Sequence, residues 1–200
     1  MLKLLTTLAL LYDETRLHLL MTDKFSVSLT TARLLLRPLH CGDAETLFSI
    51  FSDPEVMRYF NTPPWASLEE AHDVIDSSLE KMKRQESITL AIVLKETNEL
   101  IGKCMLFSYE PESKRAELGF GVARQHWGKG IIPEAGKALL EYGFDALGLR
   151  RIEAEIDPEN IASAKTLERL GFIKEGLLRQ RWEVNGVVSD SALYGLLVSD

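Results

Sequence analysis

A glycine-containing loop between an expected strand and an expected helix carries the residues best suited to chemistry. The loop reads Gln125-His126-Trp127-Gly128-Lys129-Gly130, and a helical pattern of apolar residues begins at Ile131. Glycine lets the backbone approach a bound group closely, and free N–H groups at the start of a helix attract anions. The loop therefore predicts a phosphate-binding site.

Two common nucleotide-binding motifs do not match this loop. The chain contains no G-x-x-x-x-G-K-[ST] run, which excludes a Walker phosphate loop. The dinucleotide fingerprint also fails, because Arg124 stands where a third glycine should follow Gly119 and Gly121. Taken alone, the loop is also compatible with an ordinary strand-to-helix turn.

The elements that must position the loop form a mixed pattern of strands and helices. Strands are expected over residues 31–38, 88–94, 100–109, 115–122, 151–157, 173–184 and 187–198. The three strands between 88 and 122 are joined by short polar turns, which predicts an antiparallel meander, and Asn185-Gly186 predicts a hairpin. Helices are expected after Asp43 (as the N-cap), after a capping box at Ser67–Glu70, from Ile131, and from Ile161.

Composition limits the classes of function. A net charge of −7 and a pI near 5.2 argue against nucleic acid as a partner and favour cationic partners. Cys41 and Cys104 have no metal-ligand spacing with each other or with the histidines. Two cysteines in a chain of 200 residues are typical of a reducing compartment, so we expect a cytoplasmic protein without a metal.

Residues 1–24 are expected to be a peripheral extension, and residues 25–200 a single domain. The leucine-rich start of the chain is followed at once by Asp13, Glu14 and Arg16, and it lacks a small-residue cleavage site. The apolar run is also too short to cross a membrane. We therefore expect an extra amphipathic helix, or a protein that truly begins at Met21.

Three motifs in the correct order resemble the GNAT family of N-acyltransferases. The loop at 125–130 is similar to the coenzyme A pyrophosphate loop Q/R-x-x-G-x-G/A. Residues 157–172 are similar to the D-x-x-N-x-x-S…L-x-x-L-G-F signature of the branch that acetylates ribosomal protein N-termini. Asn185-Gly186 is followed by Asp190 and Tyr194, as in that branch. The resemblance implies a mixed α/β (α+β) fold with a central, mostly antiparallel sheet flanked by helices.

The same resemblance implies roles for individual residues with acetyl-CoA as cosubstrate. The backbone of Phe120 and Val122 would pair with the pantetheine arm, and the amides around Gln125 and from Gly128 through Lys129 and Gly130 to Ile131 would hold the pyrophosphate. Asn160 would bond the pantetheine amide region, and Ser163 would donate to the departing thiolate. The structural alternatives are core packing for Phe120, a helix cap for Asn160 and a neutral helix position for Ser163.

The implied reaction is attack of a free amine on a thioester. It requires a neutral amine, donors for the developing oxyanion and a proton for the thiolate. Glu117 shares a strand face with Gly119 and Gly121 and is our candidate base, acting through water. The alternative for Glu117 is a strand carboxylate in a salt bridge.

The resemblance favours a protein N-terminal α-amine as the acceptor. However, Trp182 stands where some ribosomal members have a carboxylate, and the neighbouring Glu183 would face the opposite side of its strand. A small-molecule amine, such as a polyamine or an aminoglycoside, therefore stays open, as does a CoA-binding module without catalysis. Trp65 and Trp182 are expected either to line a substrate pocket or to fill the core. We expect no nucleic acid or membrane partner and allow for a homodimer.

Overall fold

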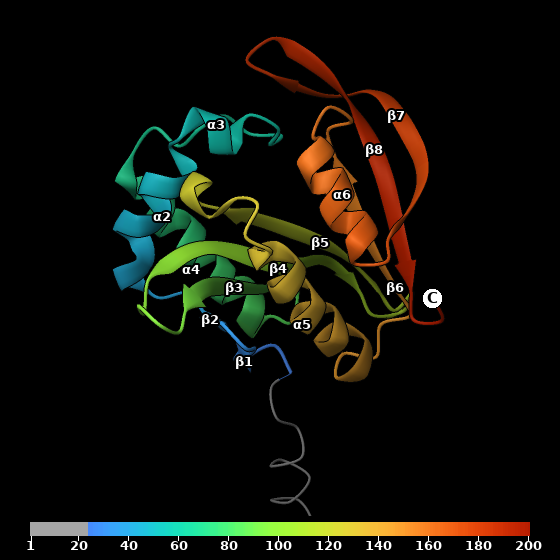
Figure 1. Ribbon diagram of the computed structural model, residues 1–200, viewed down its shortest axis with the longest axis horizontal. Coiled ribbons are helices and arrows are strands. Elements are labelled where there is room, and N and C mark those ends of the chain that lie inside the picture. The colour runs from blue at the N-terminus through green and yellow to red at the C-terminus, as the bar shows by residue number, and fades with distance from the viewer. Residues whose placement is uncertain (1–23) are drawn as a thin grey trace, which may run out of the picture.

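An eight-stranded sheet organises the computed structural model, which describes residues 24–200, so the predicted extension at residues 1–24 lies outside the described residues except for Lys24. The strands lie in the order β1-β2-β3-β4-β5-β6-β8-β7 (Figure 1). Their bounds are β1 (Leu29–Thr30), β2 (Leu34–Pro38), β3 (Ile88–Leu94), β4 (Leu100–Glu110), β5 (Arg115–Val122), β6 (Arg151–Ile156), β7 (Ile173–Val184) and β8 (Val187–Leu197). Every neighbouring pair is antiparallel except β5 and β6, which confirms the predicted mostly antiparallel sheet.

The predicted meander and the predicted hairpin are both present. β3, β4 and β5 pair in sequence order, with Ala91 opposite Lys103 and Lys103 opposite Gly121. The β7–β8 hairpin closes where Val184 faces Val187. Asn185 and Gly186 there have φ values of 51° and 80°, the conformations that a two-residue hairpin turn requires. The tip of this hairpin projects past the rest of the sheet (Figure 1).

Helices cover both faces of the sheet. In Figure 1, α5 (Ile131–Asp145) and α6 (Ile161–Arg169) lie in front of the sheet, and α4 (Leu68–Lys83) lies behind it. α2 (Ala44–Phe51) and α3 (Pro54–Met57) pack with α4. None of the helices within residues 24–200 combines the length and hydrophobicity needed to cross a membrane.

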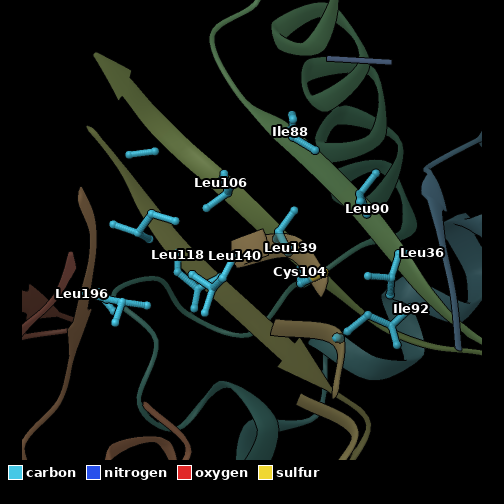
Figure 2. Close-up of a cluster of buried hydrophobic side chains, with 14 of the residues drawn as sticks. Leu36, Ile88, Leu90, Ile92, Cys104, Leu106, Leu118, Leu139, Leu140 and Leu196 are labelled. Atoms are coloured by element: carbon cyan, nitrogen blue, oxygen red, sulfur yellow. The ribbon is translucent and has the colours of Figure 1, made fainter. Parts of the chain in front are cut away.

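Two buried clusters join these layers. The larger cluster places leucine and isoleucine side chains of β2 to β5 against Leu139 and Leu140 of α5, as Figure 2 shows. The second cluster joins β3 and β4 to α2, α3 and α4, with Phe51 and Ile75 almost completely buried. The sheet is therefore held between two apolar layers, and its strand ends are left to carry the site.

Two predicted helix caps have different partners from those expected. Asp43 is the N-cap of α2 but makes no side-chain cap bond. Its carboxylate instead accepts hydrogen bonds from the two terminal guanidinium nitrogens of Arg37, both at 2.8 Å, and from the His40 N–H at 2.9 Å. The capping box predicted at Ser67 is wrong, because Ser67 makes no cap bond and Glu70 accepts the Ala66 N–H at 2.9 Å.

Besides the 3₁₀ helix η1 (Cys41–Asp43) directly before α2, two further short helices were not predicted. The Asp53-Pro54 pair ends α2, as expected, but it also begins α3, because Asp53 accepts the Glu55 N–H at 2.9 Å. A short 3₁₀ helix, η2 (Arg124–His126), leads from β5 into the glycine loop. Both elements lie at one end of the sheet, beside the pocket described next.

Candidate active site

The two central strands β5 and β6 separate after three paired residues. Arg115, Ala116 and Glu117 pair with residues 151–153, and Glu117 lies opposite Glu153. β5 then continues to Val122 beside β4 alone, while β6 continues to Ile156 beside β8. The edge of β5 beyond Glu117 therefore has no neighbouring strand.

A pocket of about 230 Å³ lies along this open edge. It collects segments that are far apart in sequence: the end of β5, the glycine loop, the first turns of α5 and α6, and the α3 region. The predicted residues that line it are Phe120, Val122, Gly128, Gly130, Ile131, Asn160 and Ser163. The predicted residues outside its lining are Glu117, Gln125 and Lys129. Sequence reasoning missed Glu55, Tyr59 and Phe60, which line the pocket from α3 and the segment after it.

The backbone of β5 presents polar groups to this pocket. The Ala123 N–H donates to the Ile101 carbonyl at 2.8 Å, toward β4. Because successive strand residues direct their N–H and C=O groups to alternate edges, those of Val122 and Phe120 point toward the open edge. The Trp127 indole donates to the Val122 carbonyl at 2.9 Å from that side. Phe120 and the Val122 N–H are thus positioned to pair with an extended ligand.

The glycine loop has the conformation that its residue types predict. Gly128 and Gly130 have φ values of 72° and 71°, in the left-handed region that favours glycine. A Cβ built on Gly128 would meet no heavy atom within 4 Å, so its position is open to an approaching group. Gly130 is the N-cap of α5, whose first N–H groups are available to an anion.

The start of α6 brings Asn160 and Ser163 together. Asn160 is the N-cap of the helix, and its Oδ1 accepts the Ser163 N–H at 3.0 Å. The structural alternative for Asn160, a helix cap, is therefore correct. The cap engages only the oxygen of the amide, which leaves the NH₂ group of Asn160 as a donor at the pocket wall. Ser163 is half-buried and lines the same pocket.

Glu117 lies where β5 and β6 separate and is half-buried. Burial raises the pKa of Glu117 above its ordinary value, and repulsion from Glu153 and Glu155 adds to this increase, whereas a hydrogen bond with Ser108 opposes it. Arg115 pairs with Glu153 at 2.9 Å rather than with Glu117. Within residues 24–200 Glu117 forms no salt bridge, so the alternative of a salt-bridged carboxylate is not what the structure contains.

A second carboxylate near Glu117 was not predicted. Trp182 donates its indole N–H to Glu155 at 2.6 Å, and Arg181 reaches the same oxygen at 3.3 Å. Trp182 thus neither lines the pocket nor fills the core; it holds a carboxylate. The period-two pattern Arg151-x-Glu153-x-Glu155 was the signal that could have placed Glu155 on the same sheet face as Glu117.

Lys103 is a buried amine that sequence analysis also missed. Lys103 lies on β4 opposite Gly121 of β5, and it is 9% exposed. Its Nζ lies 4.9 Å from the ring centroid of Phe51 and 5.4 Å from that of Trp65. Burial lowers the pKa of Lys103 to about 8. The two rings act in the opposite direction, because aromatic faces attract an ammonium.

His126 belongs to the loop and lines the pocket. Its Nε2 is buried and makes no hydrogen bond with any described residue, although Glu99 Oε1 lies 3.5 Å away. Within residues 24–200, no group of three or more histidine, cysteine or acidic side chains is arranged to hold a metal ion. The polar groups of the pocket suit a phosphate-bearing, amide-bearing ligand.

The family model of the acetyltransferase (GNAT) domain matches residues 33–173. The chain therefore belongs to the GNAT family of acetyltransferases, as its motifs predicted, and it is an acetyl-CoA-dependent N-acetyltransferase. The uncharacterized N-acetyltransferase p20 of Bacillus licheniformis is 41% identical over 170 residues, covering 85% of this chain and 96% of that protein.

Two further comparisons each cover at least three quarters of the chain. The spermidine N(1)-acetyltransferase of Escherichia coli K12 is 27% identical over 151 residues, covering 76% of this chain and 78% of that protein. The structure of Mycobacterium smegmatis RimJ in complex with CoA-disulfide superimposes with a TM-score of 0.79 at 23% identity, covering 88% of this chain and 90% of that one. At that identity the RimJ structure supports the fold alone.

Proposed function

We propose that this N-acetyltransferase moves the acetyl group of acetyl-CoA to the α-amine of a protein N-terminus. The observation that carries the proposal is the open edge of β5 beside a left-handed glycine loop and the Asn160–Ser163 turn. The Asn160–Ser163 turn belongs to the signature of the ribosomal branch, whereas the glycine loop and the pairing along β5 follow from the resemblance to the GNAT family as a whole. All three features line a single pocket.

The cosubstrate would lie along this pocket in an extended form. Its pantetheine arm would pair with the peptide groups of Phe120 and the Val122 N–H. Its pyrophosphate would take the N–H groups of Gly130 and Ile131 at the start of α5. Gln125 and Lys129 do not line the pocket, so the resemblance alone assigns their backbone amides to the phosphate site.

The proposed chemistry uses the raised pKa of Glu117, which lies where β5 and β6 separate. The amine nitrogen attacks the thioester carbon, the C–S bond breaks, and the amine proton passes through water to Glu117. A carboxylate whose pKa is raised is a stronger base than an exposed one. The Ser163 hydroxyl donates a hydrogen bond to the departing thiolate.

A polyamine is the second candidate acceptor. The resemblance to spermidine N(1)-acetyltransferase and the cluster of Glu117, Glu153 and Glu155 favour it, because carboxylates attract ammonium groups. The buried ammonium of Lys103 beside Phe51 argues against a highly cationic acceptor on that side.

Cytoplasmic location and a homodimer also stay proposals. The thiols of Cys41 and Cys104 are both free, in keeping with a reducing compartment. β7 is the outer strand of the sheet and exposes Ile173 and Leu177 along its length, which offers an edge to a second copy.

Release of CoA thiol from acetyl-CoA in the presence of single acceptors tests the proposal. We expect peptides with a free N-terminus to be acetylated with a higher kcat/KM than spermidine or an aminoglycoside. Peptides blocked at the N-terminus should be inactive. Binding of CoA without thiol release for any acceptor would instead support the non-catalytic module.

A further inference from the structure

An arginine distant in sequence binds the carbonyl groups of the glycine loop. Arg33 precedes β2, and its Nη1 donates to the Lys129 carbonyl at 3.0 Å, 96 residues further along the chain. Its Nη2 donates to the Gly130 carbonyl at 3.2 Å. The same nitrogen lies 3.6 Å from a Cβ built on Gly130, so Arg33 covers that side of the loop.

Glu134 holds this guanidinium in place. It lies in the first turn of α5 and accepts Arg33 Nε at 2.6 Å and the Arg33 backbone N–H at 2.8 Å. Thr31 donates its hydroxyl to the same carboxylate at 2.6 Å. The Glu134 side chain is 18% exposed, compared with 49% for Arg33, so the carboxylate is the more shielded partner. These bonds join the start of β2 to the start of α5.

The geometry of the peptide bond determines where the loop N–H groups point when Arg33 binds the loop carbonyls. In a trans peptide the C=O and the next N–H point to opposite sides. Pulling the Lys129 carbonyl toward Arg33 therefore turns the Gly130 N–H away from it. Pulling the Gly130 carbonyl does the same to the Ile131 N–H. These two N–H groups are among those assigned to the pyrophosphate, and both residues line the pocket.

We propose that Arg33 and Glu134 are positioning residues that preorganise the loop amides for the pyrophosphate of CoA. This inference rests on the proposed cofactor site. Arg33 acts through the loop carbonyls and not by direct contact with phosphate, because its guanidinium donates to those carbonyls and Arg33 does not line the pocket. Sequence reasoning offered no signal for this pair, since nothing local connects Arg33 with Glu134.

Two acetyl donors separate positioning from a purely structural role. Acetyl-CoA carries the pyrophosphate, whereas acetyl-pantetheine lacks it. In Arg33→Met, we expect KM for acetyl-CoA to rise about tenfold to a hundredfold, since the loss of charged hydrogen bonds is of that order. The kcat/KM for acetyl-pantetheine should be unchanged, and Arg33→Lys should recover part of the loss. Arg84→Met removes an arginine of an exposed pair with Glu80 and is the matched control.

Glu134→Gln should change the affinity for CoA in opposite directions, depending on whether Arg33 positions the loop or contacts the phosphate directly. A positioning pair loses its anchor, so the affinity for CoA should fall in Glu134→Gln, as it does in Arg33→Met. If Arg33 instead touched the phosphate directly, removal of the Glu134 charge would free the guanidinium, and the affinity for CoA would hold or rise. That result, or an equal loss with both acetyl donors, would overturn the proposal.

CoA binding by the unmodified protein should be measured by calorimetry before the variants are compared. Failure of the unmodified protein to bind CoA would reject the proposed cofactor site itself. Binding by the unmodified protein, with variants that behave like Arg84→Met, would reject only the positioning role. If Arg33→Met does not fold, Arg33→Lys and Glu134→Gln carry the same comparison with smaller changes in volume.

Discussion

Glu117 of β5 and Glu153 of β6 are the last register partners before the two strands separate. Arg115 and Arg151 both bind Glu153, at 2.9 Å and 2.7 Å, so one carboxylate of the pair is neutralised. Glu117 is the other, and its pKa is raised by burial and by its acidic neighbours. The point where the sheet opens therefore holds one carboxylate that is suited to accept a proton.

Glu117→Gln should distinguish the two candidate acceptors. An α-amine has a pKa of about 7.7–8.0 and a polyamine nitrogen one near 10.4, so neutralising them near neutral pH costs roughly 1 and roughly 4–5 kcal/mol. With an N-terminal acceptor, the variant should lose about tenfold in kcat/KM and recover much of it toward pH 9. With a polyamine, the loss should reach several hundredfold and persist at that pH.

The pH dependence of the activity of the parent enzyme should show the raised pKa of Glu117. If Glu117 is the base, it acts only when ionised, so the activity of the parent enzyme should fall as the pH drops through the pKa of Glu117. Because that pKa is raised, the acidic limb should lie above the usual range of a glutamate. A Glu117→Gln enzyme that matches the parent at every pH would show that Glu117 is not the base.

Gly128→Asn should weaken CoA binding strongly without unfolding the protein. Asparagine tolerates the left-handed conformation better than most residues, and the space around Gly128 is open, so the added side chain competes with the ligand rather than with the protein. Gly148→Asn is the matched control, because Gly148 has a φ of 69° and equally open surroundings. Calorimetry that finds equal CoA affinity in both variants would remove Gly128 from the phosphate site.

Ser163→Ala should lower kcat more than it raises KM for acetyl-CoA. A donor to a leaving thiolate acts mainly in the transition state, so its loss affects turnover. Ser67→Ala, at a helix start without a cap bond, should leave both constants unchanged. Steady-state kinetics in which Ser163→Ala changes only KM would make Ser163 a binding residue.

Lys103→Met should stabilise the protein at neutral pH. The folded-state pKa of about 8 lies below the ordinary value of 10.5, so between these values the folded state binds fewer protons than the unfolded chain. The free energy of unfolding of the parent should therefore rise with pH across this window. The gain from methionine, about 1–3 kcal/mol near pH 7, should shrink accordingly.

Urea unfolding from about pH 7 to about pH 10 measures this difference. Lys137→Met replaces a lysine whose side chain is 75% exposed and should show no such trend. Parallel stability curves for the parent and Lys103→Met would mean that Lys103 is as well solvated in the folded protein as in the unfolded chain.

Local patterns predicted the parts of this molecule that local physics decides. The strand from Arg115, the left-handed Gly128 and Gly130, and the Asn160 turn each follow from residues a few positions apart. For that reason, the motifs predicted the β5, loop and Asn160 sides of the pocket, whereas its α3 side was not predicted.

Contacts between distant side chains were not predictable in this way. Arg33 and Glu134 are 101 residues apart, and Trp182 and Glu155 are 27 apart. Arg37 takes the carboxylate of Asp43 that a local rule assigned to a helix cap. Arg37 and Asp43 are only six residues apart, but they belong to different elements. In all three cases an ionic or charge-assisted bond between elements determines a side chain whose local sequence allows several partners.

The most direct test of the proposed acceptor is to locate the acetyl group on one peptide. The peptide carries a free α-amine and an internal lysine, and it competes with equimolar spermidine for limiting acetyl-CoA. Mass spectrometry of the products should find the acetyl group on the α-amine, in at least about tenfold excess over acetylspermidine, because near neutral pH the α-amine is far more often neutral. Acetylation mainly of spermidine, or of the lysine side chain, would contradict the assignment of an N-terminal acceptor.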